Sequence, residues 1–480
     1  MQNALEGALA VLCATAAMAL AAFVALLLAD AGSVGSLWEL TMAITAMAVG
    51  GSVSSGASAS ASAEGASGLA SLFGGGGMSP SVSGAVEAVP LGVTLIGAAV
   101  LWIAFSRRLR RGTPQRRFSG SELAVRVSGA ATAAMILFMF VAGLGRGTAE
   151  LPASAMEGMG GLGGSASDGD SSNNPFSALM GGDAGSDPFS QLMGGDAAAQ
   201  PTVTYDAGVF ATSFGALVWA VVVLGVGCLI SQRVRLPLGG ALDRARTVWA
   251  PTVSTIVRTV LTLAGICLTA MAVIGLAVGG QARTAAGIAL LVAPNLLAVF
   301  LSLGVGAPWT AEVHPVSTDN SSNPLAGLME GMTGGGTSAA IQQPDHTEHL
   351  RSLSAGGWQV WLVALAVTCL ILISCAYRAS RTTGVVRGVP LHPYKGPMPA
   401  HLGTAERFAL ATAVVLGATT WLAGGTGNFS ISVFGSAMGG MRAGLGGSVL
   451  LSAGFGLFIG GLAGLIGSML AALQRAPKTA

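Results

Sequence analysis

Two polar side chains lie within long apolar runs of the sequence, and their types suit a transport pathway. Glu39 lies in Leu37–Val53, and Asn295 follows Pro294 at the centre of Ala285–Gly304. An ionisable residue at membrane depth is costly and often functional. A proline break can expose backbone carbonyls to a cavity, as in the broken helices of transporters. Glu39, Pro294 and Asn295 are therefore candidate pathway or binding residues.

A structural interpretation of the same residues stays open. Glu39 lies beside Trp38, which is consistent with a carboxylate that reaches headgroup water. Pro294 is consistent with a kink packed against neighbouring helices, with the Asn295 amide hydrogen-bonded across them. These two interpretations make different claims about whether the polar groups face a cavity or the protein.

The remaining candidates for chemistry are weak. "DHTEH" at 345–349 has an H-x-x-H spacing that would suit a metal on a helix, but it has no third His nearby. The sequence has no Walker loop, no G-x-S-x-G and no Cys–His pairing with a supporting context. The five cysteines all lie in apolar runs. We therefore expect no catalytic, cofactor-binding or metal-binding residues, no enzyme activity and no nucleic-acid partner.

The composition indicates an integral membrane protein, for which the lipid bilayer is the main partner. The chain of 480 residues is 52% hydrophobic and only 9% charged, with a mean hydropathy of +0.69. A soluble chain is about a quarter charged.

Apolar runs long enough to cross a bilayer predict eight full spans, since a membrane helix needs about 20 apolar residues. They lie at 8–29, 88–105, 126–145, 207–231, 252–278, 358–377, 406–424 and 447–472. The predicted fold class is all-α: a polytopic protein of eight transmembrane helices in hairpins, with two or three outer re-entrant or interfacial helices and long Gly-rich disordered outer loops.

Charge predicts the orientation. The N-terminus and the segments 106–126, 232–258, 378–407 and 475–480 hold all but four of the 23 Lys and Arg residues. The same segments hold only four of the 21 acids, namely Glu6, Glu122, Asp243 and Glu406. This side is therefore expected to be cytoplasmic, with both termini there and the protein in the plasma membrane.

The cytoplasmic arginine cluster has two interpretations. Its members Arg107, Arg108, Arg110 and Arg111 are candidates for contacts with anionic lipid headgroups. The alternative is that they only determine the topology.

This orientation leaves two apolar runs without room for a full crossing. Segment 37–53 lies between an outward and an inward span, and so does 285–305. We expect both to be re-entrant or interfacial on the outer side, where protein or water covers non-helical backbone. The alternative is that they are true spans.

The chain then divides into four hairpins. They comprise 1–117 with the outer segment 37–53, 118–246 with a disordered outer loop 146–206, 247–405 with the outer segment 285–305 and a flexible loop 306–356, and 406–480. The first and third share a layout, which suggests two four-span halves related as parallel repeats.

The outer loops carry a repeated phrase. "NPFSALMGGDAGSDPFSQLMGGD" spans 174–196, "NPLAGLMEGM" spans 323–332, and a weaker copy lies at 68–77. The copies within 174–196 and 323–332 have the pattern of one or two turns of amphipathic helix with an N-cap and a proline start, and the weaker copy lacks the cap. Such a helix would form only when docked, since it is too short to persist alone in water. The alternative is disordered low-complexity sequence.

Several stretches resemble the streptophobe family of very hydrophobic multi-span proteins of actinomycetes. They are "LTMAITAMAVGGSVS" (40–54), "VPLGVTLIGAAVLW" with the following "RRLRR" (89–111), "GIALLVAPNLLAVFLSLGVGAPW" (287–309) and the Gly-rich last span. The resemblance implies an uncharacterised membrane protein and brings no catalytic residues.

The expected function is that of a non-enzymatic structural or interaction protein with mobile outer loops. Its partner would be an envelope protein or further copies of itself. The alternative is a transporter or channel that uses Glu39 and the broken helix at Pro294–Asn295. The shortage of polar residues in the spans favours the first.

Overall fold

The computed structural model describes most of the chain outside its longest loops. The described residues are 2–58, 81–110, 120–150, 202–231, 240–278, 280–315, 346–349, 357–385, 398–433 and 436–474. All copies of the repeated phrase and Arg111 lie outside them, so the interpretation of the phrase stays a prediction.

The described chain is mostly helical, as expected. The helices are α1 (Gln2–Leu28), α2 (Leu37–Met47), α4 (Leu91–Arg110), α5 (Gly120–Leu144), α9 (Val209–Ile230), α10 (Gly240–Val278), α11 (Gly280–Gly304), α13 (Gly357–Val385), α14 (Met398–Ala423) and α15 (Val449–Leu473), with a short 3-10 helix η1 (Ala31–Ser33). Of the helices in the described ranges, seven are long and apolar enough to cross a membrane: α1, α5, α9, α10, α11, α13 and α15. These seven helices are consistent with the expected polytopic membrane protein.

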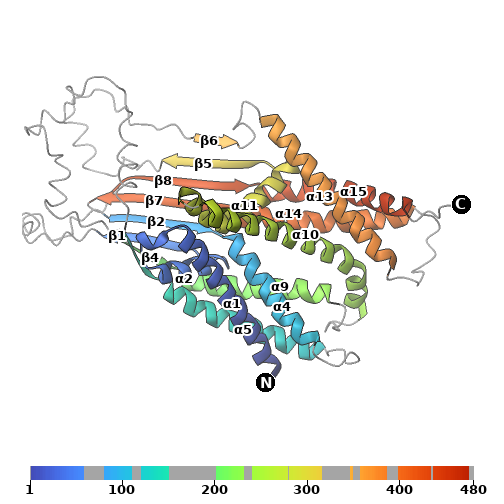
Figure 1. The fold of residues 1–480 in the computed structure, drawn as a ribbon, viewed down its shortest axis with the longest axis horizontal. Helices are drawn as coiled ribbons and strands as arrows, with labels where there is room; N and C mark the ends of the chain where they lie inside the picture. Colours follow the sequence, from blue (N-terminus) through green and yellow to red (C-terminus); the bar gives the residue numbers. More distant parts are fainter. Residues whose placement is uncertain are drawn as a thin grey trace, which may run out of the picture.

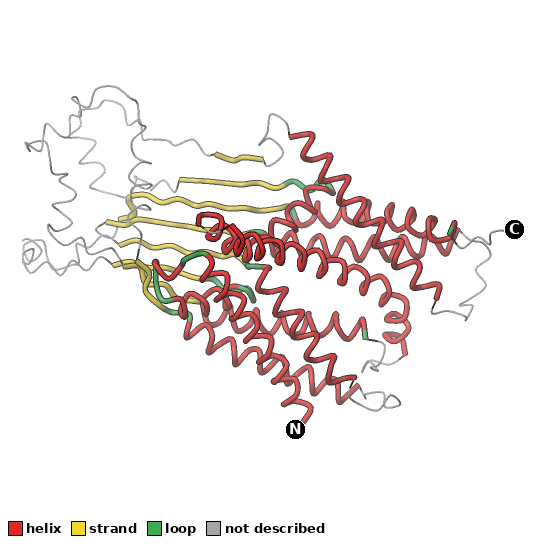
Figure 2. The backbone as a smooth tube through the Cα atoms, viewed as in Figure 1, coloured by secondary structure: helices red, strands yellow, loops and turns green. Residues whose placement is uncertain are grey.

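One antiparallel sheet extends from one end of the helical bundle, and both termini lie at the opposite end (Figure 1). Its strands are β1 (Val53–Ser58), β2 (Ser81–Ala88), β3 (Gly147–Glu150), β4 (Thr202–Ala207), β5 (Trp309–Pro315), β6 (His346–His349), β7 (Gly425–Val433) and β8 (Ser436–Gly447). Their order across the sheet is β3-β4-β1-β2-β7-β8-β5-β6. Figure 2 shows the division into a layer of strands and a bundle of helices.

The fold is an internal repeat. In both halves the order is helix, second helix, two strands, two helices, two strands and a last helix. Numbered within its half, each half of the sheet has the strand order third, fourth, first, second. The halves join where β2 pairs with β7, the second strand of one half with the third strand of the other. The two-half layout expected from the spans thus appears in the strands as well.

The match between the halves extends to single residues. The turns after α2 and α11 each hold a glycine with positive φ, Gly50 at 95° and Gly306 at 93°. The next N–H bonds back to a helix carbonyl in both, Gly51 to Ala46 and Ala307 to Ser302, which is the Schellman form of helix end.

The strand ladders continue this correspondence. In the first half Val53 opposes Ala207, and the equivalent pair in the second half is Trp309 opposite Gly447. The helices that follow start at the equivalent residues Val209 and Val449. The described residues of these turns and strands in the first half therefore have defined counterparts in the second.

Each half has its own apolar core, and α11 connects the two. One cluster around Val11, Phe138 and Leu224 lies in the first half, and another around Phe408 and Ala376 lies in the second. A third cluster combines Leu91 of α4 with Ala298 and Val299 of α11 and Trp309 of β5.

Close backbone approach holds α11 in this central position. A Cβ built at Gly287 of α11 would lie 2.6 Å from Ala25 O and 2.9 Å from Leu28 C, both in the backbone of α1. Small residues permit this approach in membrane bundles, where dispersion contacts replace the hydrophobic effect.

Two segments expected to be disordered or flexible loops contain strands, and this is a correction. The outer loop 146–206 includes β3 and most of β4, and loop 306–356 includes β5 and β6. β4 and β5 contain Thr and Val with Tyr or Trp, which favour strands, but each is short and lies beside a long Gly-rich stretch. Partners far away in the sequence provide their hydrogen bonds, so composition alone suggested disorder.

We predict opposite effects of Gly→Ala at two helical glycines. Gly265 of α10 has open space where a Cβ would lie, so Gly265→Ala should stabilise the protein by about 0.5–1 kcal/mol through helix propensity. Gly287→Ala should instead destabilise it by about 1–3 kcal/mol, because its neighbours are backbone atoms and cannot move aside. Thermal unfolding of the detergent-solubilised protein measures both. Equal effects at the two sites would contradict the described packing of α11.

Candidate functional site: equivalent positions in α2 and α11

Asn295 fixes the point where strand β2 becomes helix α4. It is 8% exposed. Its Oδ1 accepts a hydrogen bond from Leu91 N–H at 2.9 Å, and its Nδ2 donates to Val89 O at 2.7 Å. Leu91 is the first residue of α4, whose N–H has no partner within the helix. The amide therefore joins the second half of the protein to backbone groups of the first.

Pro294 acts beside it. A proline inside a helix has no N–H, so the carbonyl four residues earlier, Leu290 O, lacks its usual partner. That carbonyl lies against α4: a Cβ built at Gly92 would collide with Leu290 O and would lie 3.1 Å from Leu291 O. The sequence-predicted helix break is thus a close packing point between α11 and α4, and α11 continues through it from Gly280 to Gly304.

Glu39 lies in the first turn of α2 and is half-buried. A Cβ built at Gly147 would collide with Glu39 Oε2 and would lie 2.7 Å from the Tyr205 hydroxyl. The carboxylate and the phenol therefore meet beside the backbone of β3. Tyr205 is 8% exposed, and among the described residues its hydroxyl has no hydrogen-bond partner. Burial, and secondly the charge of Glu39, raise the pKa of Tyr205 to about 12.

Glu39 and Asn295 occupy the same position in the two halves. Counting back from the matched glycines Gly50 and Gly306, Glu39 corresponds to Asn295, and Trp38 corresponds to Pro294. Their surroundings differ. Pro294 is buried between the halves, whereas Trp38 is 57% exposed.

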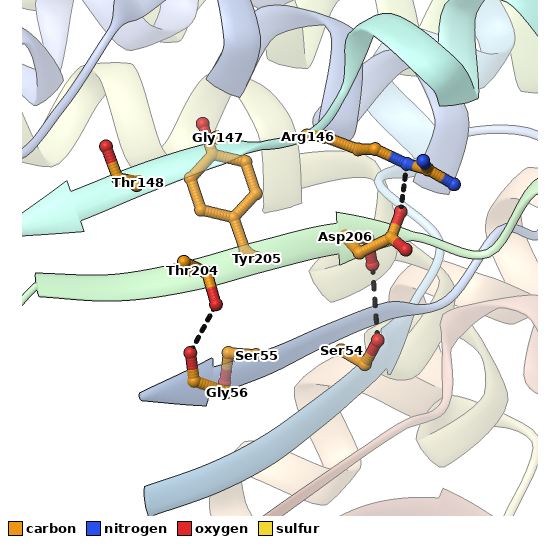
Figure 3. A pocket seen from close by; sticks show the side chains of 9 residues that line it. All are labelled: Ser54, Ser55, Gly56, Arg146, Gly147, Thr148, Thr204, Tyr205 and Asp206. Carbon is orange, nitrogen blue, oxygen red and sulfur yellow. Dashed lines mark hydrogen bonds and ion pairs between the residues drawn. The ribbon is translucent and has the colours of Figure 1, made fainter. Parts of the chain in front are cut away.

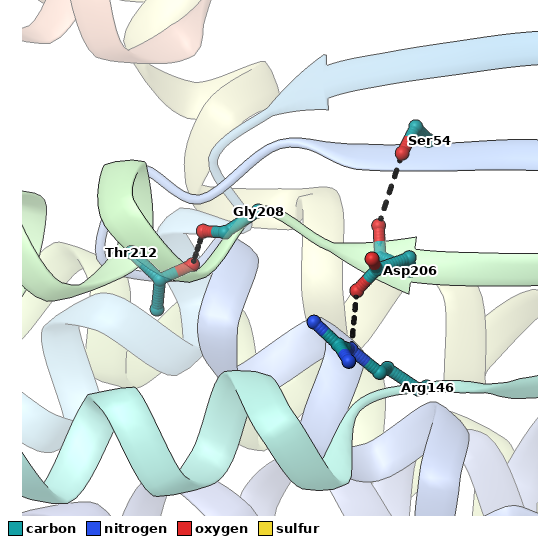
Figure 4. A network of polar contacts seen from close by, with 5 residues as sticks. All are labelled: Ser54, Arg146, Asp206, Gly208 and Thr212. Atoms are coloured by element: carbon teal, nitrogen blue, oxygen red, sulfur yellow. Dashed lines mark hydrogen bonds and ion pairs between the residues drawn. The ribbon is translucent and has the colours of Figure 1, made fainter.

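The sheet carries a shallow polar groove of about 640 Å³ on β1, β3 and β4 (Figure 3). Its polar side chains include Arg146, Asp206, Thr148 and Thr204. Arg146 Nε donates to Asp206 Oδ1 at 2.8 Å, and Ser54 Oγ donates to the Asp206 backbone carbonyl at 3.4 Å (Figure 4). Neither Glu39 nor Asn295 lines this groove, so it does not bring the two candidate pathway residues together.

The groove offers hydrogen-bonding groups. Its serines and threonines have no His among its lining residues to act as a general base. Within the described ranges, no three His, Cys, Asp or Glu side chains gather as metal ligands. The H-x-x-H pair His346 and His349 lies in strand β6, so its helical spacing argument does not apply.

Three of the four arginines that are candidates for lipid-headgroup contacts lie in α4. Arg107, Arg108 and Arg110 are in the last turn of α4, at the end of the bundle away from the sheet (Figure 1). Arg107 is exposed.

Two features of this site were missed in the sequence. Tyr205 lies in "TVTYDA", whose alternation of apolar and polar residues is a strand pattern. The equivalence of Glu39 and Asn295 was also missed, and the paired glycines after each apolar run, Gly50–Gly51 and Gly304 with Gly306, were the available signal.

We predict that Asn295→Ala destabilises the protein by about 1–3 kcal/mol, because it leaves the buried Leu91 N–H and the partly buried Val89 carbonyl without this partner. Asn295→Asp should be no better, since a carboxylate accepts from Leu91 N–H but cannot donate to Val89 O. The matched control is Asn428→Ala on the exposed part of β7, which should stay within about 0.5 kcal/mol of the parent. Chemical denaturation in detergent measures each. Equal stability of Asn295→Ala and Asn428→Ala would refute the bridging role.

We also predict that Tyr205 has an unusually high pKa. The difference between the ultraviolet titration curves of the parent and of Tyr205→Phe reports the Tyr205 phenol alone. Its midpoint should lie near pH 12. Glu39→Gln should lower this midpoint yet leave it above 10, because burial is the larger cause. Since the raised pKa favours the neutral phenol, its contribution to stability is complete below pH 10 and is lost as the pH rises through 12. A midpoint near 10 would show an exposed phenol.

No family model, curated protein or solved structure matches this chain.

Proposed function

We propose that this protein is a non-enzymatic structural or interaction protein of the plasma membrane, and that its sheet is the interaction platform. The observation that carries the proposal is the direct continuation of membrane helices into strands. β4 ends at Ala207 and α9 begins at Val209, and β8 ends at Gly447 and α15 begins at Val449. Such short connections hold a polar, hydrogen-bonded surface at a fixed position outside the bilayer.

The strand directions support eight crossings. All neighbouring strands are antiparallel, so β1, β3, β5 and β7 leave the bundle and the other four return to it. Helices α1, α5, α10 and α14 then run toward the sheet, and α4, α9, α13 and α15 run away from it.

The same parity applies to α2 and α11. Each lies between a helix that runs toward the sheet and a strand that continues outward, so neither adds a crossing. This favours embedded helices whose two ends both lie on the sheet side. α11 is apolar enough to span, but α1, α4, α13 and α14 pack against it, so its length and composition do not by themselves require a crossing.

The arginine distribution supports an outward-facing sheet. The end of the bundle with both termini carries Arg107, Arg108 and Arg110 of α4, and positive charge favours the cytoplasmic side. We also propose that these arginines contact lipid headgroups. The stretches quoted above support the further proposal that the chain is related to the streptophobe family.

A transport function has less support. Both functional groups of the Asn295 amide are hydrogen-bonded to backbone, and Glu39 lies in a separate environment beside Tyr205. Alternating access requires a site near the bilayer midplane between the repeats, and Asn295 instead seals that interface.

Cysteine accessibility tests the proposed platform and its orientation. In a variant that lacks the five native cysteines, single cysteines at Ser54, Thr148 or Thr426, all exposed in the sheet, should react with an impermeant thiol reagent on intact cells. Cysteines at Arg107 or Ala472, exposed at the other end, should react only after permeabilisation. The reverse pattern would place the sheet in the cytoplasm and overturn the proposal.

A further inference from the structure

We infer that the interaction partner is a second copy of this chain, which extends the sheet by pairing β6 of one copy with β3 of the next. The inference rests on the proposed function, because both edges must lie in the same compartment. The starting observation is the joint between the halves. There β2, the second strand of the first half, pairs with β7, the third strand of the second half.

Among the described strands, the two edge strands of the sheet are of the same two kinds, a second and a third strand. β6 is the second strand of the second half, and β3 is the third strand of the first half. Their directions also agree, because β6 returns to the bundle as β2 does and β3 leaves it as β7 does. Two copies that stand side by side in one membrane can therefore repeat the internal joint as an antiparallel pair.

The membrane excludes the simplest alternative. An antiparallel pair of two β6 strands needs a two-fold axis across the strands, and this axis would invert one copy in the bilayer. A head-to-tail contact keeps both copies upright. Such contacts form a closed ring, or an open array if the rotation does not close.

The internal ladder also specifies the register. Ala85 of β2 opposes Asn428 of β7. The ladders of the two halves make His349 the counterpart of Ala85 and Glu150 the counterpart of Asn428. His349 of one copy is therefore expected opposite Glu150 of the next.

The helices near the β3 edge also present an uncovered face. In the second half α11 is covered by α1 and α4 of the first half, and Pro294 is buried. Its counterpart Trp38 on α2 is 57% exposed. A neighbouring copy would cover this face.

One contact opposes the pairing. Gly35 forms an isolated bridge to Ala149 of β3, at the position where the internal joint has Val86 opposite Gly427. The β6 strand of the neighbouring copy must displace this bridge before it can pair there. The bridge therefore weakens the association of the two copies. A Cβ at Gly35 would lie 3.0 Å from Thr148 O, so Gly35→Val should loosen the bridge.

Disulfide cross-linking in native membranes tests the inference. Directly opposed residues in an antiparallel pair lie within disulfide range. In the variant without native cysteines, Glu150→Cys/His349→Cys should give dimers and larger species on oxidation. Co-expressed single variants should give dimers only, and each single variant alone should remain a monomer. The matched control Glu150→Cys/Thr347→Cys, displaced by two residues along β6, should cross-link much less.

Gly35→Val in the double-cysteine variant should raise the cross-linked fraction by up to about fivefold, because loss of one backbone hydrogen bond shifts an equilibrium by about that factor. Monomers from the double-cysteine variant with and without Gly35→Val would overturn the inference. So would dimers of His349→Cys alone, which show a symmetric contact. The thiol-labelling experiment is independent: outward labelling without cross-links removes self-association and leaves the platform.

Discussion

The antiparallel ladder through all eight strands is the constraint on which the rest of this structure depends. Backbone N–H and C=O groups must be satisfied wherever the chain leaves a helix at the membrane boundary. Here the leaving segments satisfy one another, and the result is one sheet of order β3-β4-β1-β2-β7-β8-β5-β6. Because few residues separate most strands from their helices, the ladder also fixes the order of the helices below it.

Within this frame, α11 joins two similar halves into one body. Its glycine approaches the backbone of α1, its proline leaves a carbonyl against Gly92, and its Asn295 amide bonds to the start of α4. These are all polar or close-packing contacts. In a bilayer, an apolar helix face packs about as well against lipid as against another helix. The specific association of the two halves therefore depends on these polar and close-packing contacts.

The two halves show how one architecture accommodates different surroundings. The position filled by Asn295 in the second half holds Glu39 in the first, where the neighbouring groups are Gly147 and the Tyr205 phenol rather than a helix start. An amide can both donate to and accept from backbone, which suits a covered interface. A carboxylate only accepts, and it suits the uncovered face of α2 beside the exposed Trp38.

The sequence by itself determined the membrane class, the apolar segments that became helices, and the accumulation of arginine at one end of the bundle. These properties depend on composition within about 20 residues, so they can be found locally. It also indicated Asn295 as a residue of consequence, with hydrogen bonding across helices as one alternative. Only the tertiary structure decided that "TVTYDA" and "SVSGAVEA" pair through β1, and that β2 then meets β7, whose paired residues Ala85 and Asn428 lie far apart in the chain. Strand pairing is non-local, and Gly-rich and Ser-rich strands gain their stability from partners that no local pattern identifies.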